Sequence, residues 1–248
     1  MAQSHACCTV PPVVSKGYQE KGKWITIDGM KTYKTGPDSA KSALLVVYDI
    51  FGFFPQTIQG ADILAHSDKE HQYQVFMPDF FEGKPVPIEW YPPDTKEKGE
   101  KLGEFFNTTG APPKTVQRIP KVVKEIESQY SNIKEWGIVG FCWGGKVVNF
   151  SSQEGTPFKA AAACHPAMVD PADAEGVTIP YAMLPSKDED KDAVEKWQKG
   201  IKTKNIVEWF PDQVHGFMAA RGDLEDENVK KNYEKAYGLL LNFFHTHM

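Results

Sequence analysis

Arginine is scarce in this chain of 248 residues: Arg118 and Arg221 are the two arginines among 28 Lys and Arg residues. The formal net charge is −5, whereas proteins that bind the phosphate backbone of nucleic acids usually carry an excess of positive charge. No apolar run approaches the roughly 20 residues that a membrane-spanning helix needs. We therefore expect no nucleic-acid partner and no membrane partner, and bidentate recognition of a carboxylate has few candidate donors.

Cysteine is also sparse, with Cys7, Cys8, Cys142 and Cys164 as the full set. Adjacent Cys7 and Cys8 cannot easily bridge each other, and the other two lie in strand or turn contexts, so reduced thiols are expected rather than a disulfide scaffold. The N-terminus has neither a basic region nor an apolar region of the signal-peptide type. These features predict a cytoplasmic protein and leave the role of Cys7 and Cys8 open.

The order of apolar and polar segments predicts one α/β domain over residues 1–248. Apolar runs that suit buried strands alternate with helix-like stretches, which is typical of a mostly parallel, doubly wound sheet. An Asp28-Gly29 turn predicts an antiparallel hairpin at its N-terminal edge. The expected strands cover 23–27, 30–33, 43–48, 74–77, 136–140, 159–164, 179–184 and 206–210, and the expected helices cover 57–70, 115–130, a stretch from 144, 191–202 and 227–245.

A proline-rich segment at about 83–113 interrupts this alternation. Six prolines, with Trp90 and Tyr91 between them, prevent a long regular helix and exclude a central strand. The segment is either a lid over the carboxyl edge of the sheet, with a short helix near 97–106, or an ordinary surface connection.

The run Gly140-Phe141-Cys142-Trp143-Gly144-Gly145 follows an expected strand and opens an expected helix. A sharp strand-to-helix turn needs glycine on both sides of its apex, and α/β-hydrolases carry their nucleophile at such an elbow. The first turn of the helix favours a thiolate and an oxyanion. The sequence therefore predicts Cys142 as the nucleophile of an acyl-transfer enzyme.

A nucleophilic cysteine needs a histidine base, which in turn needs an acid that fixes its tautomer. In this fold the three follow in the order nucleophile, acid and histidine, each after a later strand. Asp188 and His215 occupy those places. Asp188 is preferred because it lies closest to the strand end, whereas Glu189, Asp190 and Asp192 are expected to be charges at a helix N-terminus.

Four motifs together resemble the dienelactone hydrolase family (carboxymethylenebutenolidase-like), in its fungal form: 140–145, Tyr48-Asp49-Ile50-Phe51-Gly52, 78–83 (Pro-Asp-Phe-Phe-Glu-Gly) and 214–217 (Val-His-Gly-Phe). The resemblance implies a single-domain α/β-hydrolase with a Cys-Asp-His triad and neither a metal nor an organic cofactor. By position it implies Cys142, Asp188 and His215 as the triad. The backbone N–H groups of Ile50 and Trp143 would form the oxyanion hole.

The chain departs from the family at two places. Asp49 stands where the family usually has a glutamate that gates the resting thiol, so its role is either that gating or a turn contact. Arg221 follows the histidine by six residues and is the candidate for binding a substrate carboxylate, the alternative being a surface pair with Asp223 or Glu225. Arg118 is expected to be a solvated helix residue.

Two further residues are candidates for contact with substrate. His165 ends a strand at the functional edge and has either a pocket-lining or a structural role, and Phe217 follows His215 in the same loop. The expected function is hydrolysis of a small-molecule lactone or ester by a monomer or loose dimer. The alternatives are a non-catalytic small-molecule-binding protein on the same scaffold and an amidotransferase-like cysteine protein, which the spacing of the acid and the histidine disfavours.

Overall fold

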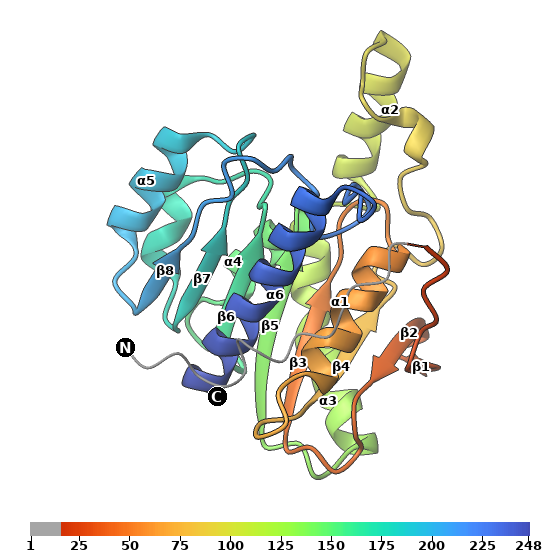
Figure 1. Ribbon diagram of the computed structural model, residues 1–248, viewed down its shortest axis with the longest axis vertical. Helices are drawn as coiled ribbons and strands as arrows, with labels where there is room; N and C mark the ends of the chain where they lie inside the picture. Colours follow the sequence, from red (N-terminus) through yellow and green to blue (C-terminus); the bar gives the residue numbers. More distant parts are fainter. Residues whose placement is uncertain (1–15) are drawn as a thin grey trace.

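The computed structural model describes residues 16–248, which contain one sheet of eight strands (Figure 1). Cys7 and Cys8 lie outside the described residues. The strand order is β1-β2-β4-β3-β5-β6-β7-β8, antiparallel at the β1–β2 and β2–β4 pairs and parallel elsewhere. The expected mostly parallel sheet with an antiparallel N-terminal hairpin is confirmed. The strands are β1 (Lys23–Ile27), β2 (Met30–Thr35), β3 (Ser42–Val47), β4 (Tyr73–Pro78), β5 (Glu135–Phe141), β6 (Phe158–Cys164), β7 (Tyr181–Leu184) and β8 (Asn205–Val207).

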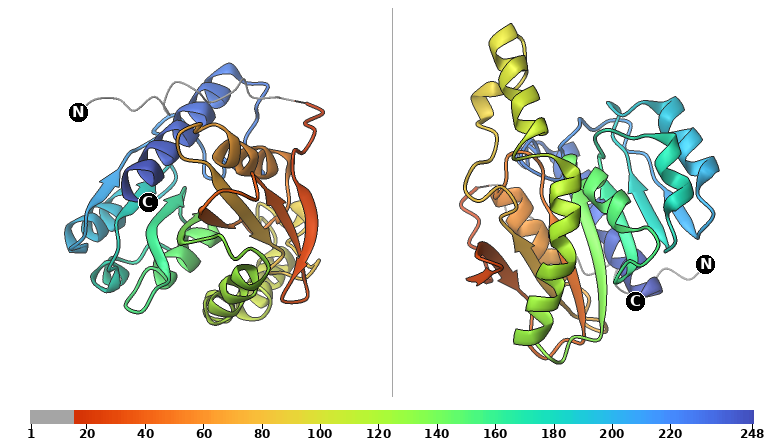
Figure 2. Two further views of the ribbon diagram at one scale, coloured as in Figure 1. Left: turned by 90° about the horizontal axis from the view of Figure 1, so that it is seen from below. Right: turned by 180° about the vertical axis from the view of Figure 1, so that it is seen from behind.

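Helices cover both faces of the sheet. The pair α1 and α6 packs on the near face in Figure 1, and α3 and α4 pack on the opposite face, which the right-hand view of Figure 2 shows. The α-helices are α1 (Pro55–His66), α2 (Lys96–Asn107), α3 (Pro112–Gln129), α4 (Trp143–Ser151), α5 (Lys191–Gly200) and α6 (Glu227–His247), with short 3₁₀ helices η2 (Ile88–Trp90) and η3 (Pro171–Gly176).

Burial of the central strands explains why they read as continuous apolar runs. Every residue of β3 and of β4 is buried, because helices cover both faces of these strands. Most expected elements lie within two or three residues of the observed ones. The largest differences are the end of α1, which stops at His66 rather than near 70, and β8, which ends at Val207 rather than at 210.

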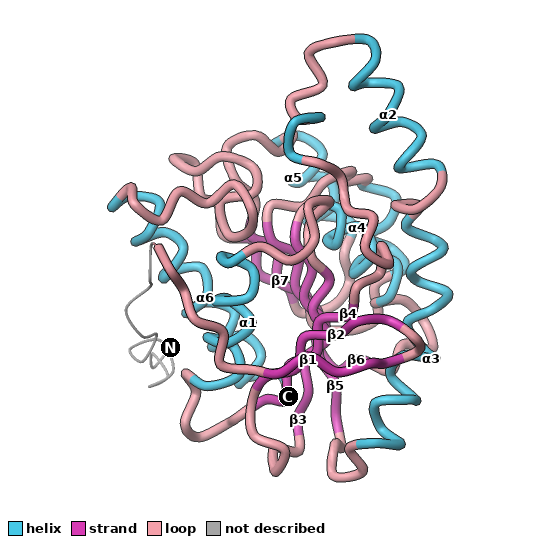
Figure 3. The backbone as a smooth tube through the Cα atoms, turned by 90° about the vertical axis from the view of Figure 1, so that its right-hand side faces the viewer, coloured by secondary structure: helices cyan, strands magenta, loops and turns pink. Residues whose placement is uncertain are grey.

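The proline-rich segment leaves the body at the carboxyl edge of the sheet. Its helix α2 projects beyond the layers of the domain, as Figures 1 and 3 show. Thr95 caps α2, since its side chain accepts a hydrogen bond from Lys98 N at 3.3 Å. The segment returns to the body at Pro112, where proline suits the first turn of α3.

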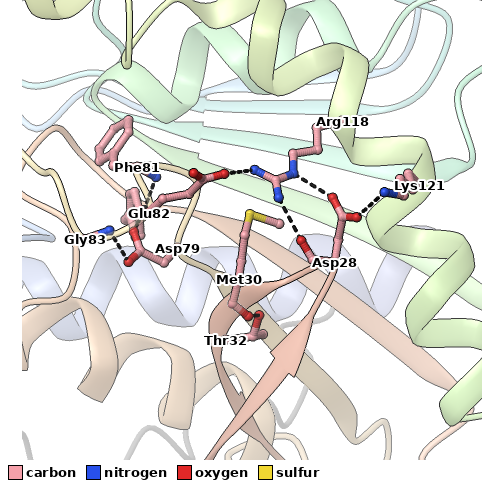
Figure 4. Close-up of polar contacts among 10 residues, drawn as sticks. Asp28, Met30, Thr32, Asp79, Phe81, Glu82, Gly83, Arg118 and Lys121 are labelled. Atoms are coloured by element: carbon pink, nitrogen blue, oxygen red, sulfur yellow. Dashed lines mark hydrogen bonds and ion pairs between the residues drawn. The ribbon is translucent and has the colours of Figure 1, made fainter.

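Ion pairs hold the base of this segment (Figure 4). Arg118, on α3, donates to Asp28 Oδ2 at 2.6 Å and to the Asp28 carbonyl at 2.7 Å, and it also pairs with Glu82. Lys121 pairs with the other oxygen of Asp28 at 2.5 Å. The expectation of a solvated Arg118 is wrong, because the hairpin turn and the segment base converge on α3 only in the folded chain.

Candidate active site

Cys142 lies at the turn between β5 and α4. Its backbone has φ 52° and ψ −113°, a conformation that is costly for a residue with a side chain. Its carbonyl accepts hydrogen bonds from Gly145 N at 3.0 Å and from Ala167 N at 2.9 Å. The residue is 9% exposed, so the side chain sits at a largely buried apex.

Two glycines allow this turn. A Cβ atom on Gly140 would lie 2.1 Å from the carbonyl oxygen of Gly144, and one on Gly144 would lie 2.2 Å from the carbonyl oxygen of Val47. Both neighbours are backbone atoms and cannot move aside. The strand, the turn and the end of β3 thus approach one another more closely than any other residue type permits.

The carboxylate that contacts the imidazole of His215 belongs to Glu189. Glu189 Oε1 lies 2.6 Å from His215 Nδ1, and the Glu189 side chain is only 3% exposed. Asp188 instead accepts a hydrogen bond from the backbone N–H of His215, at 2.8 Å to Oδ2. The expectation that Asp188 is the acid on the ring therefore disagrees with the geometry, and so does the assignment of Glu189 to a helix N-terminus, where Asp190 is the cap.

The turn after β7 explains the difference. Glu189 folds back over Ser186: its Oε1 accepts from Ser186 Oγ at 3.2 Å, and its other oxygen accepts from Ser186 N. Distance along the chain from the strand end favours Asp188, but this fold-back buries the later residue. The Ser-x-x-Glu spacing of 186–189, which commonly directs a glutamate onto the backbone of the serine, is the sequence signal that could have identified Glu189.

The pKa of His215 reflects these contacts. Burial by itself lowers the pKa of His215, but hydrogen bonds to the side chains of Cys142 and Glu189 outweigh burial and raise the pKa above its ordinary value. His215 therefore holds a proton at neutral pH between a thiol and a carboxylate. A protonated imidazole is the partner that favours the thiolate form of a neighbouring cysteine.

The two expected oxyanion donors, the N–H groups of Ile50 and Trp143, come from the end of β3 and the start of α4. Ile50 follows the end of β3, and Trp143 is the first residue of α4, whose amide has no intrahelical partner. Within residues 16–248 neither N–H donates to a protein acceptor. The close contact of Gly144 with the carbonyl of Val47 brings the start of α4 against the end of β3.

Asp49 is almost fully buried, and its carboxylate accepts hydrogen bonds from two backbone amides. Phe51 N donates to Oδ1 at 2.9 Å and Ala220 N donates to Oδ2 at 3.2 Å. Burial raises the pKa of Asp49 to about 6, and these hydrogen bonds partly oppose the rise. The geometry matches the turn contact that the sequence left open, and it ties the end of β3 to the loop after His215.

His165 packs against the catalytic candidates without facing solvent. It is fully buried, and its ring centroid lies 5.3 Å from that of His215 and 5.7 Å from that of Phe217. Burial lowers the pKa of His165 well below its ordinary value, so the ring is neutral. Phe217 is likewise fully buried, so both residues form the wall behind His215 and not a surface open to a ligand.

Arg221 is exposed and lies next to His215. Its Nη1 donates to the carbonyl oxygen of His215 at 2.7 Å, and its guanidinium stacks on the ring of Tyr91 with 5.1 Å to the centroid. Tyr91 comes from the proline-rich segment. The alternative of a surface pair is not observed: within residues 16–248 Arg221 forms no ion pair with Asp223 or Glu225, and Glu225 pairs with Lys16 at 2.6 Å.

A cavity of about 310 Å³ lies beside His215. Its lining consists of 166–169, 188–190 and His215. This volume is at the small end of the range for small-molecule sites. Among residues 16–248 no three His, Cys, Asp or Glu side chains are grouped so that they could hold a metal ion. In the same part of the chain, no helix combines the length and hydropathy required to span a bilayer.

Comparisons with known proteins agree with this architecture. A Schizosaccharomyces pombe protein of the AIM2 family is 36% identical over 240 residues, which cover 94% of each chain. The carboxymethylenebutenolidase homolog of Homo sapiens is 27% identical over 211 residues, 81% of each chain. The crystal structure of the dienelactone hydrolase from Anabaena variabilis superimposes with a TM-score of 0.63 at 12% identity, covering 93% of this chain and 98% of that chain, which is a likeness of fold.

The model of the dienelactone hydrolase family matches residues 30–248, which include every part of the site described above. The chain therefore belongs to the dienelactone hydrolase family.

Proposed function

We propose that the protein hydrolyses a lactone or small carboxylic ester, with Cys142 as nucleophile, His215 as base and acid, and Glu189 as the carboxylate that orients His215. The observation that carries this proposal is the position of His215, whose ring forms hydrogen bonds with the side chains of both Cys142 and Glu189, while Cys142 itself lies at a strained turn. Family membership supports hydrolase activity.

In the first half of the reaction the Cys142 thiolate attacks the substrate carbonyl carbon, forming a C–S bond and a tetrahedral oxyanion. The N–H groups of Ile50 and Trp143 are the proposed donors to that oxyanion. When the intermediate collapses, the carbonyl re-forms, the C–O bond to the leaving alcohol breaks, and the protonated His215 donates its proton to the departing oxygen.

In the second half, neutral His215 accepts a proton from water as the water oxygen attacks the thioester carbonyl. The C–S bond then breaks, which releases the carboxylic acid and restores the thiolate–imidazolium pair. Glu189 keeps its contacts with Ser186 and His215 in both halves and so holds the orientation of the imidazole.

The test is hydrolysis of p-nitrophenyl esters and of lactones with and without a carboxylate by the wild type and by Cys142→Ala. We expect the substitution to reduce kcat by at least about 10³-fold, because it removes the nucleophile. Intact-mass analysis after rapid quenching should show an acyl adduct on the wild type only.

Cys164→Ala is the matched control. Cys164 is fully buried in β6, next to Phe141 in the sheet register, and has no part in the proposed reaction. This variant should keep wild-type turnover. Full activity in Cys142→Ala would show that the nucleophile is assigned wrongly. A ligand that raises the melting temperature of the wild type with neither turnover nor adduct would favour a binding protein on this scaffold.

A further inference from the structure

We propose that Asp188 is a positioning residue that holds the backbone of His215, so that two consecutive carboxylates fix one histidine. Asp188 binds the peptide N–H of His215, and Glu189 binds the ring. This inference rests on the proposed function, since it concerns the histidine of that reaction.

The two loops that carry these residues are joined along their length. Ser186 and Phe210 form a parallel bridge, and Lys187 N donates to the carbonyl of Gln213 at 3.0 Å. The contact from His215 N to Asp188 Oδ2, at 2.8 Å, continues this series one step further, beyond the last strand pairing. Asp188 thereby takes the place that a strand carbonyl would have if the pairing continued.

A bond to the ring alone leaves the position of the histidine undetermined. The ring turns about its side-chain bonds, and the next residue, Gly216, has φ 93°, which is the left-handed region. The loop therefore changes direction directly after His215. The backbone of His215 is held on both sides of this residue, by Asp188 at the N–H and by Arg221 Nη1 at the carbonyl, 2.7 Å away.

Such placement matters for rate because the Cys142 thiolate, the imidazole and the substrate carbonyl must be aligned together. A misplacement of about 1 Å costs on the order of 10²-fold in rate. Asp188 is itself exposed, so solvent can partly replace its hydrogen bond, and the expected loss is smaller.

The role requires an acceptor oxygen and not a charge. Asparagine has the same length and keeps a carbonyl oxygen in the place of Oδ2, whereas alanine removes the acceptor. At Glu189, by contrast, both the negative charge and the acceptor geometry act on the imidazolium, so glutamine cannot replace it. Replacing the carboxylate by an amide should therefore be tolerated at Asp188 and harmful at Glu189.

The experiment compares Asp188→Asn, Asp188→Ala and Glu189→Gln, with Asp192→Asn as a control. Asp192 is an exposed acid in the first turn of α5 that pairs with Lys196 at 2.6 Å, away from His215. Two readouts are used: hydrolysis of p-nitrophenyl acetate, and the pH dependence of alkylation of Cys142 by iodoacetamide, resolved by peptide mass spectrometry. Circular dichroism and the melting temperature verify that each variant is folded.

We expect Asp188→Ala to lower kcat by about fivefold to tenfold and Asp188→Asn to remain within about twofold of the wild type, as does the control. Glu189→Gln should lower kcat by about 10²-fold or more. In the alkylation profile, the inflection from deprotonation of His215 should move to lower pH in Glu189→Gln only, because Glu189 helps raise that pKa.

Two results would overturn the inference. Loss of activity in Asp188→Asn equal to that in Asp188→Ala, with a shifted alkylation profile, would make the charge of Asp188 the acid of the triad. A wild-type kcat in Asp188→Ala would show that Asp188 does not position His215 for the reaction. The alkylation readout keeps this inference separate from the proposed function. Iodoacetamide reports on the Cys142–His215 pair even if no ester is hydrolysed, whereas the proposed function is tested by Cys142→Ala.

Discussion

At the scale of single residues, the site depends on charged groups that the fold takes out of water. Each carboxylate oxygen of Glu189 accepts a hydrogen bond, and the contact of Glu189 with the imidazole helps to raise the pKa of His215. His165 is the opposite case: it is buried beside His215 and stays neutral, so it adds no positive charge that would compete with the imidazolium.

Asp49 is the residue whose ionisation should be visible in stability. Its pKa is raised from 3.8 to about 6 by burial, so the folded state holds the proton more tightly than the unfolded chain. The stabilisation is present in full below about pH 4 and is lost as the pH rises to about 6. Measured by urea unfolding, the stability of the wild type relative to Asp49→Asn should fall by roughly 2 kcal/mol between pH 4 and pH 7.

Asp212→Asn is the control for this measurement, because Asp212 is an exposed acid in the loop that precedes His215. It should not reproduce the pH dependence. If the difference between the wild type and Asp49→Asn is the same at both pH values, Asp49 is ionised equally in the folded and unfolded chain, and burial is not the dominant effect on it.

At the scale of elements, α3 fastens the N-terminal hairpin and the base of the proline-rich segment to the sheet (Figure 4). Three parts of the chain converge on Arg118, which is 26% exposed, and the Asp28 side chain is only 7% exposed. Asp79 adds a second hold at the base of the segment, since it accepts from Gly83 N at 2.8 Å and from Tyr48 Oη at 2.7 Å.

Arg118→Ala should therefore lower the free energy of unfolding by about 1–2 kcal/mol, because it leaves a nearly buried Asp28 with one partner fewer. It should also speed limited proteolysis within residues 83–111, whose base it anchors. Lys121→Ala is the matched control: Lys121 also pairs with Asp28 but is 73% exposed, so its loss should cost less than about 1 kcal/mol. Equal losses in the two variants would contradict the anchoring role.

At the scale of the whole molecule, the loop after His215 connects parts that are far apart in the sequence. Ala220 N binds Asp49 at the end of β3, and Gln56 of α1 donates to the carbonyl of Gly222 at 2.9 Å. Arg221 lies between His215 and Tyr91 of the proline-rich segment. The loop thus combines the sheet, a helix and the segment at one edge of the site.

Arg221 should discriminate between substrates if its remaining donors bind a carboxylate. We expect Arg221→Ala to lower kcat/KM for a carboxylated lactone at least about 10-fold more than for its uncarboxylated analogue, with a smaller loss common to both from the released His215 carbonyl. Arg221→Lys should fall between, because lysine keeps the charge but not the planar pair of donors. Equal losses for both substrates would restrict Arg221 to the backbone contact.

The sequence predicted most of the fold because local patterns and burial agree. Apolar runs such as 43–48 became β3, and the Asp28-Gly29 turn joins β1 to β2. Predictions were weaker where a side chain meets a distant partner. Arg118 looked solvated because its acceptors lie 90 and 36 residues away along the chain. Phe217 was a candidate for contact with substrate, although its side chain is fully buried in the core.

The sequence by itself determined the succession of strands and helices along the chain. It also determined the sharp turn at Cys142, because the glycines around this residue permit it. Both features depend on hydrophobic pattern and short-range sterics. Only the tertiary structure decided which acid meets His215. Asp188 and Glu189 are neighbours in the chain with the same charge, and the Ser-x-x-Glu spacing of 186–189 favours contact between Glu189 and Ser186 without showing which carboxylate reaches the imidazole. The fold-back over Ser186 turns one carboxylate to the ring and leaves the other on the backbone.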